Sequence, residues 1–159
     1  MNSKQLKLKI VTPERLILEE MVDQVTLPTT LGEITVLPEH IPLIAGLASG
    51  DVVAVVNGEH IPMAIVGGFV EIKNNEKGIT EVAVLADFAE HIGELTDEKI
   101  EKAKARAEEL KTLMLARRSL GEGEENKEHV DFEHFEAELE RSLTRVKIAD
   151  KWRTRKYRK

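Results

Sequence analysis

The stretch Glu94-Leu95-Thr96-Asp97-Glu98-Lys99-Ile100 decides the fold, because the pattern of the chain changes there. All five prolines lie before it and none lies after it. Short apolar segments separated by turn signals fill the first part, whereas long charged segments with apolar residues at spacings of three and four fill the second. We therefore expect an α+β protein with two domains, a β-rich domain over residues 1–94 and a helical domain over residues 95–159.

The first part reads as a series of short strands. Residues 6–10, Leu-Lys-Leu-Lys-Ile, alternate with a period of two, which is typical of a strand with one buried face. Asn57-Gly58 and residues 73–78 are turn signals, and Gly67-Gly68 predicts a bulge or a close approach of two backbones. Further apolar segments are Leu16–Leu18, Val25–Leu27, Ile34–Leu37, Val52–Val56, Ile61–Val66, Phe69–Ile72 and Ile79–Leu85. Roughly eight to ten short strands predict a sandwich or a barrel.

The second part reads as two helices. Thr96 is the expected N-cap of the first helix, which Leu120-Gly121 ends, and the second helix is expected to begin near Asp131, another good N-cap. The apolar stripes are Ile100, Ala103, Ala107, Leu110 and Met114 in the first helix, then Phe132, Phe135, Leu139, Leu143 and Val146 in the second, continuing to Ala149 or Trp152. Two striped helices joined by a short loop predict an antiparallel hairpin. Its Ala-rich first stripe buries little apolar area, so we expect the hairpin to be the less stable half.

The charge is distributed unevenly along the chain. Residues 1–96 carry 6 basic and 14 acidic side chains, residues 97–140 carry 8 and 14, and residues 141–159 carry 9 and 1. The basic end could bind nucleic acid, with Trp152 and Tyr157 stacking on bases, or it could bind an acidic protein surface. It could also be a solvated tail favoured by the dipole of the helix C-terminus.

Several classes of protein are disfavoured. The chain has no cysteine, so it has no disulfide and no thiolate metal site. No apolar run is long enough to span a bilayer and no signal-peptide pattern occurs, which favours a cytoplasmic origin. Phosphate-binding glycine loops and nucleophile motifs are missing, and the five histidines are scattered, so we expect no cofactor, no metal site and no catalysis. The alternative enzyme would use a carboxylate or His40 on the β domain.

Residues 28–43 read Pro-Thr-Thr-Leu-Gly-Glu-Ile-Thr-Val-Leu-Pro-Glu-His-Ile-Pro-Leu. Pro38 and Pro42 restrict the backbone on both sides of His40, so we expect a rigid loop that loses little entropy on binding. In the order and spacing of its motifs, the whole chain resembles the epsilon subunit of F-type ATP synthases, which is the delta subunit in mitochondria. The matching segments are Gly32-Glu33-Ile34, Pro38-Glu39-His40-Ile41-Pro42-Leu43, residues 47–50, residues 67–72, residues 84–89 and residues 103–108.

The resemblance implies a β-sandwich before a two-helix domain, in a non-catalytic rotor subunit of the central stalk that couples proton-driven rotation to ATP synthesis. The first domain would bind the gamma subunit and the c-ring, with contacts at Gly32, Glu33, His40 and Pro42. The helices would extend along gamma into the catalytic head of alpha and beta subunits and inhibit ATP hydrolysis. Their basic side chains would face acidic segments of beta: Arg141, Arg145, Lys151, Arg153 and Arg155. The implied place is the cytoplasmic side of the bacterial inner membrane, peripherally and only through the complex, without a nucleic-acid partner.

The chain departs from the family in three respects. Thr35 stands where the family usually has a second glycine. Some bacterial members bind ATP through an Ile/Leu-Asp-x-x-Arg-Ala motif in the first helix. At that place this chain has Leu95-Thr96-Asp97-Glu98-Lys99-Ile100. Thr96, Lys99 and Ile100 stand where the motif has Asp, Arg and Ala, so no nucleotide binding is expected. The C-terminal tail is also longer and more basic than in the family.

Overall fold

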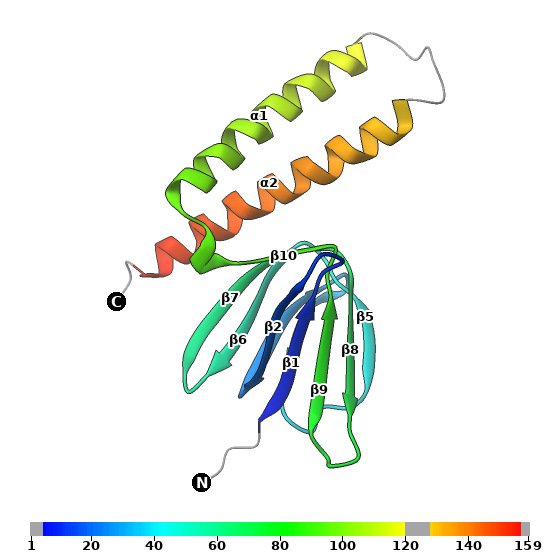
Figure 1. The fold of residues 1–159 in the computed structure, drawn as a ribbon, viewed down its shortest axis with the longest axis vertical. Helices are drawn as coiled ribbons and strands as arrows, with labels where there is room; N and C mark the ends of the chain where they lie inside the picture. The colour runs from blue at the N-terminus through cyan, green and yellow to red at the C-terminus, as the bar shows by residue number, and fades with distance from the viewer. Residues whose placement is uncertain (1–4, 120–127, 157–159) are drawn as a thin grey trace. The chain divides into compact units, whose positions relative to one another are not determined.

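The chain forms two compact units, residues 1–94 and residues 95–159. A computed structural model describes residues 5–119 and 128–156. The first unit, the β domain, contains ten strands and one turn of 3-10 helix, and the second contains two α-helices that contact each other (Figure 1). The prediction of an α+β fold with a β-sandwich before a helical hairpin is therefore confirmed.

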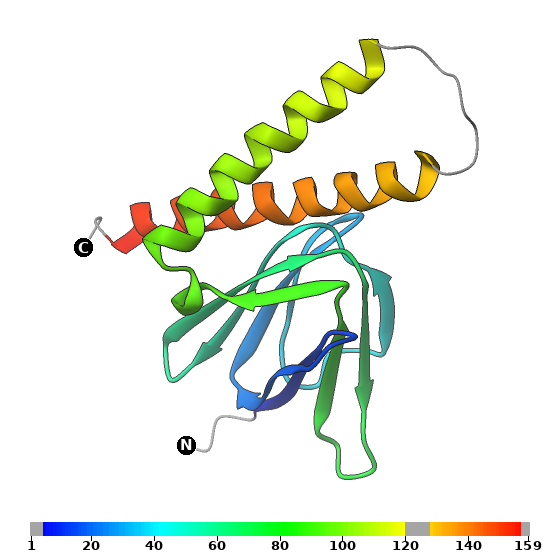
Figure 2. The same ribbon diagram turned by 45° about the horizontal axis from the view of Figure 1, so that its top comes forward.

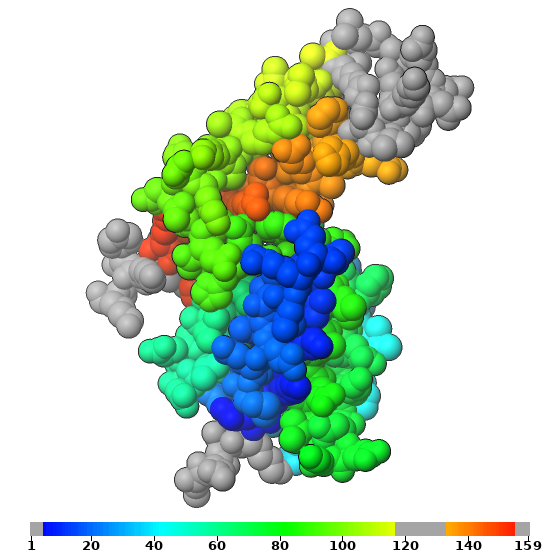
Figure 3. Space-filling view, in the orientation of Figure 1, coloured from blue at the N-terminus to red at the C-terminus, as the bar shows by residue number. Residues whose placement is uncertain are grey.

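The ten strands of the β domain form two five-stranded sheets. The strands are β1 (Leu6–Val11), β2 (Leu16–Val22), β3 (Gln24–Thr29), β4 (Gly32–Val36), β5 (Leu43–Gly46), β6 (Gly50–Val56), β7 (Glu59–Val66), β8 (Phe69–Asn74), β9 (Thr80–Leu85) and β10 (Phe88–His91). The first sheet has the order β2-β1-β9-β8-β5 and the second the order β10-β7-β6-β3-β4. All pairs of strands are antiparallel except β1 with β9. In the space-filling view, the blue N-terminal strands accordingly lie beside the green segment of β8 and β9 (Figure 3).

The core of the β domain lies between the two sheets. In β1, Leu6, Leu8 and Ile10 have no exposed surface, whereas Lys7 and Lys9 point outward, as the alternation predicted. Both sheets supply fully buried residues to the same cluster, including Val25, Leu27, Met63, Ile65, Val70, Val82 and Val84. Two faces that each bury alternate residues in this way give the interior of a sandwich.

Two glycine-containing turns shape the ends of the strands. Asn57-Gly58 joins β6 to β7 with φ of +52° and +80°, the left-handed pair that a two-residue hairpin turn requires. Gly67-Gly68 joins β7 to β8, and a Cβ on Gly68 would lie 2.0 Å from the carbonyl oxygen of Leu85. The predicted close approach of two backbones is thus confirmed.

Two short strands were missed in the sequence. β5 is an edge strand paired only with β8, and β10 is an edge strand paired only with β7 (Figure 2). Each has four residues, so neither offers enough alternation for a pattern to be recognised. Their extended conformation depends on the hydrogen bonds of the neighbouring strand.

The first helix, α1 (Asp97–Ser119), begins where the sequence indicated, after the 3-10 turn η1 (Ile92–Glu94). The hydroxyl of Thr96 accepts a hydrogen bond from the N–H of Lys99 at 3.3 Å, so Thr96 is the N-cap. The stripe residues Ile100, Ala103, Ala107 and Leu110 are buried, and Met114 is half-buried. The predicted break at Leu120-Gly121 lies outside the described residues.

The second helix, α2 (Glu128–Lys156), departs from the prediction in two ways. It begins at Glu128, so a start near Asp131 is wrong; Asp131 lies in the first turn, where the helix dipole also favours a carboxylate. Leu143 is 40% exposed, so its place in the buried stripe is wrong too, whereas Ser142 and Ala149, seven residues apart, are buried. Small buried side chains such as these allow two helices to approach closely. The side chain of Phe132 lies outside the described residues.

Candidate partner-binding surfaces

Gly32 and Glu33 open strand β4 at the turn that follows β3. Gly32 has a φ of +123°, and a Cβ there would meet nothing within 4 Å, so the backbone conformation and not the space calls for glycine. Thr29 closes the turn, because its hydroxyl donates to the carbonyl of Gly32 and accepts from the N–H of Leu31 at 3.2 Å. Leu31 is 99% exposed and Glu33 is exposed, so the turn presents an apolar tip beside a carboxylate.

His40 and Pro42 lie in the loop of residues 37–42, which joins β4 to β5. The N–H of His40 donates to the carbonyl of Leu37 at 3.1 Å, and Nδ1 of His40 lies 2.7 Å from the carbonyl oxygen of Ile41. Leu37 and Ile41 are exposed, and His40 is half-buried. The loop therefore carries apolar side chains on both sides of the imidazole.

The four residues expected to contact gamma and the c-ring form two places and not one. Gly32 and Glu33 begin β4, whereas His40 and Pro42 follow its end. Five strand residues at about 3.3 Å each separate the two places by about 16 Å. A partner that touches both must extend along the whole edge strand.

A row of apolar side chains, three of them exposed and Val11 half-buried, crosses the outer face of the first sheet. Leu16, Val11, Leu85 and Phe69 are in register on β2, β1, β9 and β8, and we call these four residues the apolar row. Leu16, Leu85 and Phe69 are 50%, 56% and 62% exposed. Ile44 of β5, the next outward position beyond Gly46, is 73% exposed. Exposed apolar patches are typical of protein–protein interaction sites, so the apolar row is a candidate surface for a partner.

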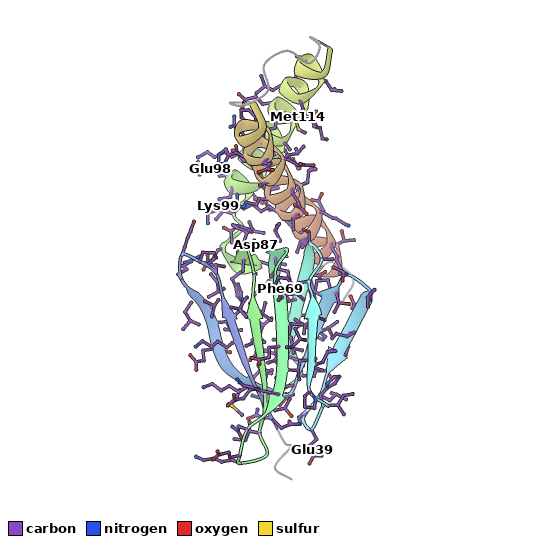
Figure 4. All side chains as sticks on the ribbon, turned by 90° about the vertical axis from the view of Figure 1, so that its right-hand side faces the viewer. Glu39, Phe69, Asp87, Glu98, Lys99 and Met114 are labelled. Atoms are coloured by element: carbon purple, nitrogen blue, oxygen red, sulfur yellow. The ribbon has the colours of Figure 1, made fainter. Side chains whose placement is uncertain are left out.

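The apolar row lies at the same end of the sandwich as Gly32 and Glu33. Gly46 is the register neighbour of Phe69, and its carbonyl accepts a hydrogen bond of 3.0 Å from the N–H of Thr30, in the turn beside Gly32. Phe69 and Glu39 lie at opposite ends of the β domain (Figure 4). The loop of residues 37–42 is therefore a separate surface.

The sequence did contain a signal for the apolar row. A strand with one buried face should not have two adjacent apolar residues, because one of them must point outward. Ile10-Val11, Phe69-Val70 and Val84-Leu85 are such pairs, and in each the residue of the row is the outward one. These segments were predicted as strands, but the second, outward-pointing apolar residue of each pair was not recognised.

The basic residues expected to act in inhibition lie on the second half of α2. Arg153 forms an ion pair with Asp97 at the start of α1. Arg141 and Arg145 are half-buried and Lys151 is exposed, and Arg155 lies in the last turns of the helix. All five residues thus follow the helix at spacings of two to six residues, and Arg153 already binds a carboxylate within the hairpin.

A second ion pair between the helices was missed in the sequence. The guanidinium of Arg106 donates from Nε to Glu138 at 2.8 Å and from Nη2 to the other oxygen of Glu138 at 3.0 Å, and its Nη1 donates to Glu109 at 2.8 Å. The hydrogen bond from Arg106 lowers the pKa of Glu138, and the two carboxylates raise the pKa of Arg106. Because Asp97 pairs with Arg153 and Arg106 with Glu138, α2 runs antiparallel to α1.

Other kinds of site are not assembled by the described residues. Over residues 5–119 and 128–156 there is no group of three or more acidic or histidine side chains that could hold a metal ion. Within the same ranges, no helix is long and apolar enough to cross a membrane. The histidines remain apart, for example His60 on β7 and His91 at the end of β10, where Nδ1 accepts the N–H of Gly93 at 2.9 Å.

Comparison with known proteins identifies the family. Residues 5–92 match the model described as the beta-sandwich domain of the ATP synthase delta/epsilon chain. The ATP synthase epsilon chain of Nitratidesulfovibrio vulgaris (strain DP4) is 37% identical over 145 residues, which cover 91% of this chain and 96% of that protein. The chain belongs to the ATP synthase delta/epsilon chain family. The resemblance found in the sequence is thus confirmed.

Further members of the ATP synthase delta/epsilon chain family extend this likeness over the helices. The ATP synthase epsilon chain of Desulforamulus reducens is 34% identical over 148 residues, which cover 93% of this chain and 99% of that protein. A chain in the structure of the Euglena gracilis mitochondrial ATP synthase superposes with a TM-score of 0.56 at 24% identity, covering 94% of this chain and 80% of that one. At this identity the superposition supports the fold alone.

Proposed function

We propose that this chain is the non-catalytic epsilon chain of an F-type ATP synthase and acts in the rotor. The β domain grips the gamma subunit and rests on the c-ring, so that proton-driven rotation is coupled to ATP synthesis. The helices act on the catalytic head of alpha and beta subunits and inhibit ATP hydrolysis. The chain is then peripheral to the cytoplasmic side of the bacterial inner membrane and reaches the membrane only through the complex.

The apolar row is the observation that carries the grip on gamma. Three of its four side chains are at least half-exposed, and a monomer gains nothing from holding them in water. Covering them with a partner removes this apolar area from water, and because each side chain is already about half-buried, it contributes roughly half of the ~1.5 to 3 kcal/mol of a full burial. The turn at Gly32 and Glu33 borders the row, so a partner on the row also reaches Glu33. His40 and Pro42 offer a second contact at the far end of β4.

The inhibitory role rests on the charges of α2. Arg141, Arg145, Lys151, Arg153 and Arg155 lie within 15 residues of one helix, which can face an acidic surface of the beta subunit. In the folded hairpin, Arg153 binds Asp97. When the helices extend, Arg153 loses Asp97 and gains a carboxylate of the beta subunit. The ion pair lost on opening is therefore replaced by one with the partner.

Co-purification with gamma tests the grip. The full chain should bind a purified gamma subunit, and Phe69→Thr with Leu85→Thr should weaken that binding at least tenfold, because central apolar anchors dominate an interface. Threonine keeps the preference for a strand, so the fold should be retained. Lys73→Thr, an exposed outward change on the same strand, is the matched control and should bind as the wild type. Failure of the wild-type chain to bind gamma would refute the proposed function.

A further inference from the structure

The loop of residues 37–42 is fixed by two side chains of the β8–β9 hairpin. The N–H of Glu39 donates to Oγ1 of Thr80 at 2.7 Å. The same hydroxyl donates to Oδ1 of Asn74 at 2.7 Å, and Nδ2 of Asn74 donates to the carbonyl oxygen of His40 at 3.1 Å. The three bonds link an N–H and a carbonyl of two successive loop residues through one Thr and one Asn, so both backbone groups have a fixed direction.

The loop needs this support because its backbone is strained. Glu39 has a φ of +69°, in the left-handed region that residues with a Cβ rarely adopt. Its N–H is satisfied by a hydroxyl that is itself only 1% exposed, so the bond is protected from competing water. Without Thr80, the N–H of Glu39 and the side-chain oxygen of Asn74 both lose a partner.

The loop carries apolar side chains that are not buried inside the domain. Leu37 and Ile41 are 52% and 74% exposed and flank His40. A partner that covers them binds more tightly to a loop that already holds the bound shape, because less conformational entropy is lost. Thr80 is buried, so its contribution is made only through the loop.

We infer that Thr80 and Asn74 are positioning residues for partner binding, which hold the loop of residues 37–42 in the shape that presents Leu37, His40 and Ile41 to the gamma subunit. This inference rests on the proposed function, and it assigns residues of the β8–β9 hairpin a role in the binding of gamma. It also assigns to Thr80 a role that its burial alone does not indicate.

The test compares the full-length wild type with Thr80→Val, which keeps the shape of the side chain and removes the hydroxyl. Amide hydrogen exchange of Glu39 and His40 in the free chain should become about tenfold faster, and affinity for purified gamma should fall about fivefold to tenfold, as expected for one lost hydrogen bond. Thr80→Ser keeps the hydroxyl and should restore both. Asn74→Ala, at an exposed position, should reproduce the effect of Thr80→Val without a change in the core.

Asn75 provides the matched control. Its Oδ1 accepts from the N–H groups of Lys77 and Ile79 at 3.0 Å each, so it stabilises the same hairpin without touching the loop. Asn75→Ala should lower the stability of the domain and leave loop exchange and gamma affinity unchanged.

Two results would overturn the inference while the proposed function stands: unchanged loop exchange in Thr80→Val, or faster exchange with unchanged affinity for gamma. Equal losses of affinity in Thr80→Val and Asn75→Ala would also overturn it, because a general loss of stability then explains both. Failure of the wild-type chain to bind gamma would refute the proposed function together with this role.

Discussion

Gly68 is the glycine at which an added Cβ would meet the closest atom. Its φ is +101°, and an added Cβ would lie 2.0 Å from the carbonyl oxygen of Leu85 and 2.8 Å from Cα of Ala86. Both neighbours are backbone atoms, which cannot turn aside as a flexible side chain can. The turn between β7 and β8 therefore fixes the distance to the end of β9.

Gly68→Ala should destabilise the chain by about 3 kcal/mol or more, since backbone strain and overpacking add. Gly58→Ala is the control: Gly58 also has a positive φ, +80°, but an added Cβ there meets nothing within 4 Å, so only the strain of about 1 kcal/mol should appear. Urea unfolding followed by far-ultraviolet circular dichroism gives both values. Equal losses in the two variants would show that the close approach at Gly68 is relaxed at little cost.

Local chemistry made some single residues predictable and left others hidden. Thr96 was predicted as an N-cap because the hydroxyl acts on an N–H three residues away. The importance of Thr80 could not be predicted, because its partner Glu39 lies 41 residues away and only the sandwich brings the two together. Asp131 was misplaced because an N-cap and a first turn favour the same carboxylate.

Among the strands and helices, prediction succeeded where one face is buried over a long segment. Strand β1 carries its period over its whole length and helix α1 carries it from Ile100 to Leu110, so both were found. Helix α2 was found and the burial of Ala149 was predicted, but Leu143 was wrongly placed in the buried stripe, and neither the buried Ser142 nor the ion pair of Glu138 was predicted. Neither small nor charged residues stand out in a search for apolar stripes.

The ion pair between Arg106 and Glu138 makes the hairpin sensitive to acid. The pKa of Glu138 is lower in the folded chain than its ordinary value of 4.5. The pair therefore contributes stability above that value and loses it as the pH falls through the lower, folded pKa. Glu138→Gln should lower the urea midpoint of the hairpin at pH 7, and the difference from the wild type should disappear as the pH falls below the ordinary pKa of a glutamate and through the lower pKa of Glu138 in the folded chain.

Fluorescence of Trp152, the single tryptophan of the chain, follows the unfolding of the hairpin because it lies on α2. Glu136→Gln changes an exposed carboxylate on the same helix and should shift the midpoint little at any pH. If the two glutamate variants behaved alike, the effect would come from the net charge of the helix and not from the pair with Arg106.

For the complete molecule, the two units should be separable in function. The apolar core cluster lies wholly within residues 6–89, so the β domain contains its own core. Deletion of residues 95–159 should leave a domain that unfolds cooperatively and binds gamma, while ATP hydrolysis by the assembled enzyme should rise several-fold, as expected when an inhibitory contact worth about 1 kcal/mol or more is removed. Unchanged hydrolysis would show that the hairpin does not inhibit.

The parallel pairing of β1 with β9 has a consequence for synthesis of the chain on the ribosome. β1 is an inner strand of its sheet, yet one of its two neighbours is completed only at Leu85. A nascent chain that stops before this residue leaves one side of β1 without its hydrogen-bonding partner, and such exposed edges promote aggregation. The high contact order of this pair makes folding slow compared with that of a hairpin. The order of events follows from the topology: most of the β domain must leave the ribosome before its first strand has a permanent place.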